Sequence, residues 1–370
     1  MERESMKILS AKVTPAPTSS LTINETEEIE DTEQAILWCG CGRFLLSVII
    51  SATLWGSGTH TASNAVKCGW DPVFLAWICS VTSILATIFC RIIMCGRGEQ
   101  INSCKLGPHS VTAALVIKRI LPICSLSLLA NSLYFLALDN QRTSEVVALF
   151  SCNKAFSYLL SWTILRDQFL GTRVVAVICC MAGVVMMSHA ESHEEDTQNN
   201  EILTLSAAAV TASNEVLFRL LIGRLSCQES ATFLGLCSVC SSLFLWWVPL
   251  LVYLQKTAEV PEVSTALSME YLCVTVIIFS LFQFLEKIGS HFLNTAGESV
   301  GVYLGVAVTA AMDQQSEFPS AGKLMGMSAI GIGTMLVIIP ENWQEYLGIE
   351  QVHQDDILED TKSKTSLSTV

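Results

Sequence analysis

Long apolar stretches alternate with short polar segments through most of the chain. A helix rises about 1.5 Å per residue, so roughly 20 residues cross the hydrocarbon core of a bilayer, which is about 30 Å thick. Stretches of that size lie at approximately 44–64, 72–92, 117–137, 144–165, 172–189, 203–222, 231–254, 269–288, 294–313 and 322–340. The pattern predicts an all-α, polytopic membrane protein with ten transmembrane helices.

A weak internal echo relates the two halves of this pattern. SEVVALF at 144–150 resembles GESVGVY at 297–303, which places Glu145 and Glu298 at matching positions. In the next span of each half, Gly171 and Gly183 have the same spacing as Ala321 and Gly333. Five spans separate the copies, and an odd number of crossings inserts the second copy upside down. The echo predicts a 5+5 inverted repeat with a substrate site near the membrane midplane.

This reading divides the chain into five segments. Residues 44–189 and 203–340 form the two five-helix repeats, separated by an acidic luminal or extracellular loop at 190–202. A disordered N-terminal arm at 1–43 and a C-terminal tail at 341–370 flank them.

Composition supports a membrane protein and argues against nucleic-acid binding. The 370 residues are 51% hydrophobic and 15% charged, with a mean hydropathy of +0.50. The net charge is −13, and the acidic residues gather in the terminal segments and short loops, which leaves no basic surface for nucleic acid. The N-terminus lacks the apolar core of a signal peptide, so we expect the first span to act as an uncleaved targeting signal.

The distribution of Lys and Arg predicts that both termini are cytosolic. With that orientation, ten basic residues flank cytosolic loops: Arg43, Arg91, Arg97, Lys105, Lys118, Arg119, Arg166, Arg173, Arg224 and Lys287. Four lie on the opposite side: Lys67, Arg142, Lys256 and Lys323. The positive-inside rule favours this orientation.

The sequence gives no reason to expect an enzyme, a metal site or a cofactor. Most of the fifteen cysteines lie within apolar runs, where they behave as small hydrophobes. Cys39-x-Cys41 has no second pair with which to complete a four-ligand site. Phosphate-loop, dinucleotide, hydrolase and zincin motifs are all missing.

Lys154 is the main candidate functional residue. It lies near the centre of the span at 144–165, where a lysine costs about 2.5–3.5 kcal/mol and needs a water-filled cavity or a partner. Ser151, Ser157, Tyr158 and Ser161 fall on the same helix face, and Asn153 precedes the lysine. We expect Lys154 to face substrate; the alternative is a structural ion pair with Glu215 in the span at 203–222.

Other polar residues within spans give weaker signals. Trp55 and His60 give the first span a polar outer half, which suits either a substrate site or a helix contact. Asn131 in the third span suits interhelical hydrogen bonding as well as substrate binding. Glu145 and Glu298 suit either proton or cation transfer or solvated helix starts.

Two features suggest protein partners. Gly322-x-x-x-Gly326 suits close helix packing or a homodimer. The C-terminal Ser368-Thr369-Val370 fits a peptide ligand of the kind that PDZ domains bind.

Residues 144–187, with the string Cys-Asn-Lys-Ala-Phe at 152–156, resemble the fourth and fifth spans of solute carrier family 35, subfamily F, in the drug/metabolite transporter superfamily. The likeness continues through WGSGTH, VLFRLLIG and IPENW. It implies a ten-helix carrier with cytosolic termini in the Golgi, endoplasmic reticulum or plasma membrane. The branch it resembles is associated with thiamine transport, and the wider family moves nucleotide sugars.

Two departures from that branch put the substrate in question. Glu215 stands where the resemblance implies a basic residue, and the ninth span lacks a proline near Ala307. Thiamine is a cation that a lone lysine repels, so only a Glu215 partner reconciles Lys154 with it. We therefore expect a secondary-active transporter of a small organic solute, thiamine being one candidate; the alternatives are an anionic or nucleotide-sugar substrate, or a non-transporting scaffold or sensor.

Overall fold

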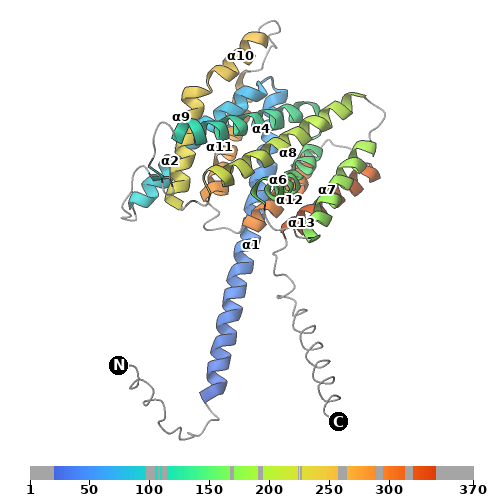
Figure 1. Cartoon of the computed structure of the whole chain (residues 1–370). Helices are drawn as coiled ribbons and strands as arrows, with labels where there is room; N and C mark the ends of the chain where they lie inside the picture. Colours follow the sequence, from blue (N-terminus) through green and yellow to red (C-terminus); the bar gives the residue numbers. More distant parts are fainter. Residues whose placement is uncertain are drawn as a thin grey trace. The chain divides into compact units, whose positions relative to one another are not determined.

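The part of the chain that the structure describes is helical, apart from two short strands (Figure 1). The computed structural model describes residues 21–96, 105–106, 109–110, 115–166, 171–190, 195–223, 225, 227–256, 265–288, 295–312 and 320–338, with side-chain burial from residue 42 on. Two compact units are distinguished, Met1–Arg43 and Phe44–Val370. The second unit holds almost all of the described side chains.

The elements follow one another in a simple order. They are α1 (Leu21–Lys67), α2 (Pro72–Gly96), β1 (Lys105–Leu106), β2 (His109–Ser110), η1 (Val116–Ile120), α4 (Leu121–Asn140), α5 (Thr143–Phe150), α6 (Asn153–Leu165), α7 (Gly171–Ala190), α8 (Glu195–Leu221), α9 (Cys227–Phe244), α10 (Trp247–Lys256), α11 (Thr265–Ile288), α12 (Thr295–Met312) and α13 (Ala321–Ile338). The two strands pair antiparallel, Lys105 opposite Ser110.

Several helices are suited to a membrane. Among the described residues, three helical stretches are long and apolar enough to cross a bilayer: Val116–Asn140, Gly171–His189 and Met269–Glu286. The bent pair Glu229–Phe244 and Trp247–Gln255, with an angle of 44°, gives a fourth if it is one span. Shorter apolar helices include Gly297–Met312 and Ala321–Val337. The all-helical, polytopic class agrees with the sequence, while the count of ten spans stays a prediction.

Two expected boundaries differ from the structure. α1 begins at Leu21, so the helix takes in the second half of the arm that was expected to be disordered. Residues 21–38 contain neither Gly nor Pro, and nothing in them interrupts a helix. The range 144–165, expected as one helix, is divided into α5 and α6.

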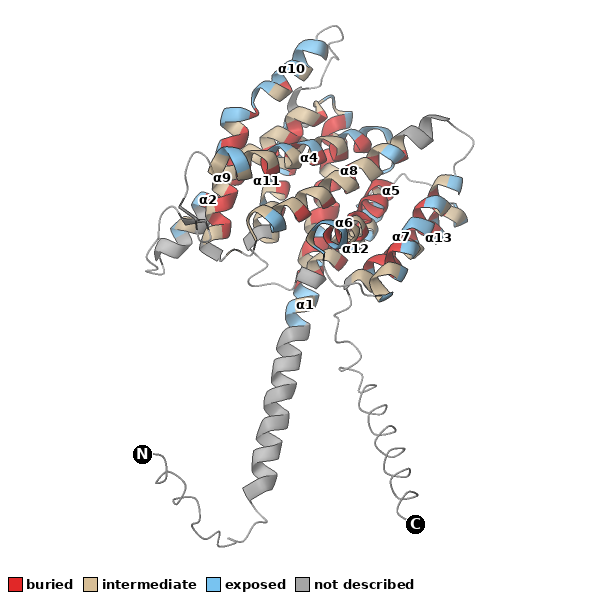
Figure 2. Ribbon diagram, viewed as in Figure 1, coloured by how far each residue is buried: buried red, intermediate tan, exposed pale blue. Residues whose placement is uncertain are grey.

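Buried residues line the inner sides of the helices in Figure 2 and form two clusters. The larger cluster includes Trp55, Tyr134 and Phe135, which are all less than a tenth exposed. The smaller one joins α6, α7 and α13 through residues such as Tyr158, Cys180 and Ile330.

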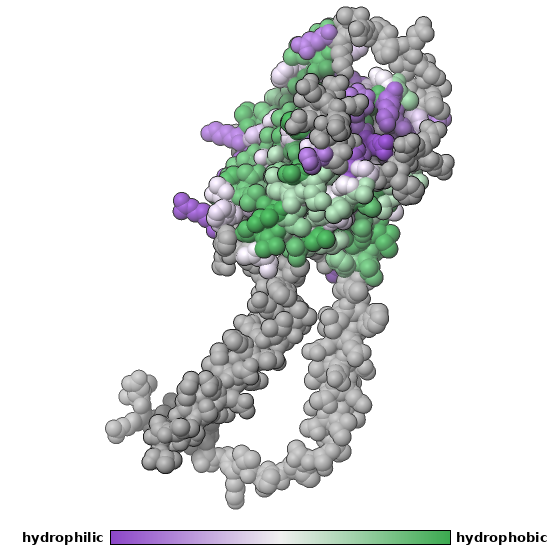
Figure 3. All heavy atoms as spheres, turned by 90° about the vertical axis from the view of Figure 1, so that its right-hand side faces the viewer, coloured by the Kyte–Doolittle hydropathy of each residue, from purple (hydrophilic) through white to green (hydrophobic). Residues whose placement is uncertain are grey.

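Large apolar side chains also cover the outside of the helices. Leu85, Ile178 and Val185 are each exposed by more than 60%. Hydrophobic residues dominate the face shown in Figure 3, and hydrophilic residues gather toward its upper part. An exposed apolar surface of this extent is what hydrocarbon chains of a bilayer cover.

Helices α7 and α13 pack against each other in a symmetric way. Cys179 Sγ lies 3.4 Å from the carbonyl oxygen of Ala329, and Cys180 Sγ lies 3.8 Å from that of Ile330; each pair is 150 residues apart. A Cβ added to Gly183 would lie 2.7 Å from the Gly326 oxygen, and one added to Gly333 would lie 2.8 Å from the Ala176 oxygen.

The contacts between α7 and α13 are symmetric: adding 150 to a residue number of α7 gives the equivalent position of α13. Position 183 meets 326, which is 176 plus 150, while position 176 meets 333, which is 183 plus 150. A two-fold axis relates surfaces in this way. The helices run antiparallel, because a later residue of α7 meets an earlier residue of α13. Gly326 is occupied by this contact within the chain, so the expected homodimer through Gly322-x-x-x-Gly326 gains no support.

Helix α12 approaches α1 through a glycine on every turn. A Cβ added to Gly301 would lie 2.6 Å from the Val48 oxygen, and one added to Gly305 would lie 3.3 Å from the Gly56 nitrogen. Gly297 similarly contacts Phe44 and Ser47. Glycines at this spacing let two helix backbones come close, which holds α12 beside α1.

Candidate functional site

Lys154 lies just after a tight turn that divides the expected fourth span. Ser151 and Cys152 remain in the right-handed helical region, with ψ of −15° and −11°. The Cys152 N–H donates to Leu149 O, three residues back, as in a 3₁₀ turn. The Ser151 hydroxyl donates to Ala148 O at 2.6 Å. The backbone is tightened rather than unwound, and Lys154 falls in the first turn of α6.

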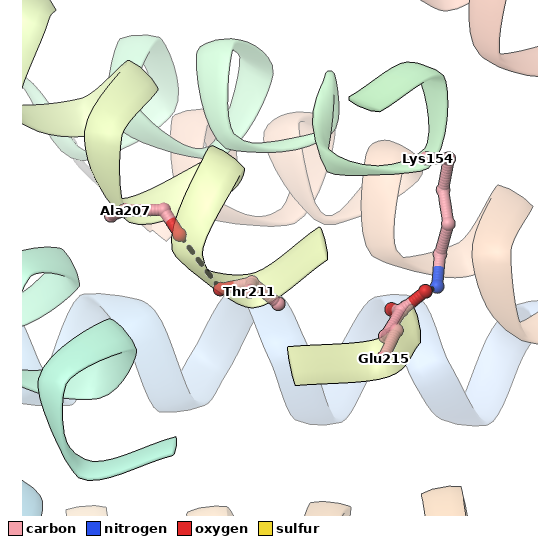
Figure 4. A network of polar contacts seen from close by, with 4 residues as sticks. All are labelled: Lys154, Ala207, Thr211 and Glu215. Carbon is pink, nitrogen blue, oxygen red and sulfur yellow. Dashed lines mark hydrogen bonds and ion pairs between the residues drawn. The ribbon is translucent and has the colours of Figure 1, made fainter. Parts of the chain in front are cut away.

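The Lys154 ammonium is paired with a carboxylate of a helix distant in sequence. Its Nζ lies 2.7 Å from Glu215 Oε1 on α8, and Figure 4 shows the two side chains pointing toward each other. The side chains are 29% and 18% exposed. The pair therefore connects the range 144–165 with the range 203–222, and both side chains remain partly exposed.

Two further carboxylates act on the same lysine. Beyond Glu215, the Lys154 ammonium is attracted by Glu286 on α11 and by Glu298 on α12. The positive charge of Lys154 thus lies in the field of carboxylates from three helices. These carboxylates compensate the ammonium, which lowers its repulsion of a second positive charge.

An asparagine stands beside each member of the pair. Asn153 precedes Lys154 on α6, and Asn214 precedes Glu215 on α8. Neither Oδ1 atom accepts a hydrogen bond from any residue that the structure describes, although both are buried. Amide oxygens in this position are available to a ligand that carries N–H or O–H donors. The sequence analysis missed Asn214; its place next to Glu215 was the available signal.

The other expected site residues have contacts of their own in the structure. Trp55 stacks on Phe150 with ring centroids 5.4 Å apart and lies 4.9 Å from Phe282 in the larger core cluster. Its buried Nε1 has no hydrogen-bond partner among the described residues. His60 Nε2 lies 3.2 Å from Asn64 of its own helix. Asn131 on α4 is half-buried.

The polar residues that follow Lys154 on α6 and share one helix face are packed against protein. Ser157, Tyr158 and Ser161 are 4%, 7% and 3% exposed. The Arg173 guanidinium lies 5.4 Å from the centre of the Tyr158 ring, on the side of the smaller core cluster. These residues face protein in this structure, and a contact between them and a substrate stays a prediction.

A second ion pair was missed in the sequence. Lys323 Nζ on α13 lies 2.8 Å from Glu145 Oε1 on α5, and both side chains are only 9% exposed. In the sequence, Lys323 was counted only as a charge flanking a loop, and the role of Glu145 was left open between proton or cation transfer and a solvated helix start. The matching positions of Glu145 and Glu298 in the echoed segments were the signal that could have drawn attention to it.

The structure shows no metal-ligand cluster within its described part. No three His, Cys, Asp or Glu side chains there are grouped so as to hold a metal ion. The described cysteines are free thiols.

Comparison with known proteins places the chain among membrane carriers. The EamA-like transporter family matches residues 43–189. Solute carrier family 35 member F3 from Mus musculus is 31% identical over 324 residues, which cover 85% of this chain and 74% of that protein. Its counterpart from Homo sapiens is 32% identical over 65% of this chain and 58% of its own length.

Solute carrier family 35 member F4 from Mus musculus is 28% identical over 81% of this chain and 64% of its own length. This chain thus spans less than two thirds of two of these three relatives. A crystal structure aligns with 79% of this chain and 95% of its own at 13% identity, with a TM-score of 0.49, which is too low a similarity to fix the fold.

Proposed function

Because this chain belongs to subfamily F of solute carrier family 35, we propose that it carries a small organic cation across a membrane by alternating access. The proposal includes ten spans in a 5+5 inverted repeat, with cytosolic termini. The symmetric contact between α7 and α13 supports the repeat, since positions 150 residues apart meet there. The membrane would be an endomembrane or the plasma membrane.

The observation that carries the substrate class is the set of charges around Lys154. A lone lysine repels a cation. Glu215 at 2.7 Å neutralises it, and Glu286 and Glu298 add two further negative charges within its field. A lysine whose charge is already compensated by Glu215 supports a positively charged ligand over a negatively charged one, which would need the ammonium free of its partner.

The pair also suggests how the site works. In the substrate-free site the Lys154 ammonium compensates Glu215, so that the carboxylate is not left buried and unpaired. An arriving cation displaces the ammonium and takes its place on Glu215. When the substrate leaves on the other side, Lys154 returns and allows the empty carrier to change conformation.

Thiamine meets the chemical demands of this site. Its ring cation suits the carboxylates, and its aminopyrimidine supplies N–H donors for the Asn153 and Asn214 oxygens. The association of the resembled branch with thiamine points the same way. The anionic alternative, a nucleotide sugar, rests on Lys154 itself and requires the ammonium to leave Glu215 for a phosphate.

Thermal stabilisation of the purified full chain tests the substrate class. A ligand present at about 100 times its Kd stabilises the folded state by about 2.7 kcal/mol. We expect thiamine to raise the melting temperature of the wild-type protein, and a nucleotide sugar or a nucleotide to leave it unchanged. Stabilisation by the nucleotide sugar but not by thiamine would contradict the proposal.

A matched pair of variants ties the effect to the site. Thr211 lies one turn from Glu215 and donates only to Ala207 O of its own helix, at 2.8 Å (Figure 4). Glu215→Gln should abolish stabilisation by thiamine, whereas Thr211→Val should keep it. Equal stabilisation of both variants would place the ligand elsewhere.

The scaffold alternative depends on Ser368, Thr369 and Val370, which lie outside the described residues. Deletion of these three residues should leave thiamine stabilisation intact under the carrier proposal.

A further inference from the structure

We propose that Glu201 binds a proton beside the ion pair of Glu145 and Lys323, and that the bound proton keeps the two repeats in contact there. The inference rests on the proposed carrier function and supplies it with a coupling ion, apart from the substrate site around Lys154. The proton adds from water to the Glu201 carboxylate, and no other bond forms or breaks.

The first observation is a carboxylate that is buried without a counter-charge. Glu201 lies in the second turn of α8 and is 6% exposed. Ser188, near the end of α7, donates a hydrogen bond to it, and no residue that the structure describes forms an ion pair with it. A buried charge is costly unless it is paired, and a proton is the simplest ligand that removes it.

The second observation is the closed ion pair beside this carboxylate. Lys323 Nζ lies 2.8 Å from Glu145 Oε1, with both side chains 9% exposed, and the charge of Glu145 acts on Glu201. Two carboxylates and one ammonium leave these three side chains with one negative charge when all are ionised. A proton on Glu201 makes the group neutral.

A hydrogen bond places α8 against the start of α5 independently of these charges. Thr204, three residues after Glu201 and on the same face of α8, is fully buried. Its hydroxyl donates to Gln141 Oε1 at 2.7 Å, and Gln141 precedes the start of α5 by two residues. The buried face of α8 that carries Glu201 thus meets the chain just before Glu145.

Other charged side chains near these helix ends are exposed. Asp139 lies at the end of α4, Arg142 just before α5 and His189 at the end of α7, and water reaches all three. Solvent weakens the effect of such charges on a buried group. Burial and the charge of Glu145 are the causes that raise the pKa of the Glu201 carboxyl.

Burial links the proton to the contact between the repeats. Helices α5 and α13, which the ion pair connects, belong to different proposed repeats. If they separate, water reaches Glu201 and favours its ionised form, whereas the closed arrangement favours the protonated form. Binding of the proton therefore favours contact at this end, and its release favours opening, because such coupling is reciprocal.

Infrared difference spectroscopy of the full chain in lipid nanodiscs, without substrate, tests the proton site. Between pH 8 and pH 5 we expect the C=O band of a protonated carboxyl to appear in the wild type and to be lost in Glu201→Gln. Ser188→Ala removes a donor that favours the ionised form, so the band should appear at higher pH. Glu270→Gln removes an exposed carboxyl of α11 and should keep the wild-type titration of this band.

Hydrogen exchange in the same nanodiscs, corrected for the intrinsic pH dependence of amide exchange, tests the effect on the contact. Amides of residues 143–150 and 321–327 should exchange faster at pH 8 than at pH 5, by about tenfold for each unit by which opening lowers the Glu201 pKa. Glu201→Gln should exchange slowly at both pH values, and Glu270→Gln should behave as the wild type.

Two results would overturn the proposal. A carboxyl band that persists unchanged in Glu201→Gln would place the proton elsewhere. A pH dependence of exchange that is equal in the wild type and in Glu201→Gln would show that the proton does not act on the contact. Neither experiment uses a substrate, so a failure of thiamine to bind would count against the proposed function alone.

Discussion

At the scale of single residues, the two ion pairs of the structure differ in how far their side chains are exposed. Lys154 and Glu215 keep 29% and 18% of their side chains exposed, so a ligand can reach them. Lys323 and Glu145 keep 9% each, so their pair is closed to solvent. The sequence identified Lys154 because a charge in an apolar run is conspicuous. It could not identify Lys323, whose charge lies at a span end where lysine is common.

The buried carboxylate of Glu201, which feels the charge of Glu145, gives a prediction about stability and pH. It is 6% exposed on α8, in the segment before the predicted span at 203–222. Burial raises the pKa of the Glu201 carboxyl above its ordinary value of 4.5; a Ser188 hydrogen bond opposes this, and the Glu145 charge adds to it. The folded state therefore holds this proton more tightly than the unfolded state, and the ionised group disfavours folding as pH rises through the folded pKa.

We therefore expect Glu201→Gln to raise the melting temperature at about pH 8, and to raise it less at about pH 5, where the carboxyl is partly protonated. Thermal unfolding of both proteins at the two pH values measures this. Glu270→Gln is the control, because Glu270 is exposed on α11 and its loss should change little at either pH. A gain that is equal at both pH values would mean that the charge is not the cause.

At the scale of elements, the helix positions were largely predictable and their interruptions were not. The bounds of α4 and α7 follow from apolar runs that end at polar residues. The turn at Ser151 and Cys152 was missed, since neither residue type interrupts a helix in the way that Gly or Pro does. The bend between α9 and α10 was also missed, although Pro249 in the first turn of α10 gave a signal.

The contact between α7 and α13 gives a prediction of its own. Gly326→Val places a side chain where a Cβ already lies 2.8 Å from the Gly183 oxygen and 3.0 Å from the Met187 nitrogen. Backbone atoms cannot move aside, so we expect a loss of about 1–3 kcal/mol of stability. Gly171→Ala is the control, because nothing lies within 4 Å of a Cβ there. Thermal unfolding compares them, and a Gly326→Val protein as stable as Gly171→Ala would show that this contact is not formed.

At the scale of the whole molecule, the contact between α7 and α13 joins the two proposed repeats. Positions 150 residues apart meet in this contact, as a two-fold relation between the helices requires. Lys154 on α6 and Glu215 on α8 pair across the two proposed repeats, with carboxylates of α11 and α12 acting on the lysine. The sequence predicted the transporter family and this candidate ion pair, because charge and motif are visible along the chain, while the 5+5 repeat stays a prediction. The partners Asn214 and Lys323 required the folded structure, since contacts between distant helices leave no local pattern.

Uptake of labelled thiamine into liposomes tests the central claim most directly, with equal amounts of inserted wild-type, Lys154→Ala and Thr211→Val protein. The account predicts saturable uptake by the wild type and by Thr211→Val, and a loss of at least about tenfold for Lys154→Ala, since the empty carrier cannot return without its tethered cation. Wild-type uptake by Lys154→Ala would contradict the claim, as would a wild-type protein that takes up nucleotide sugars but no thiamine.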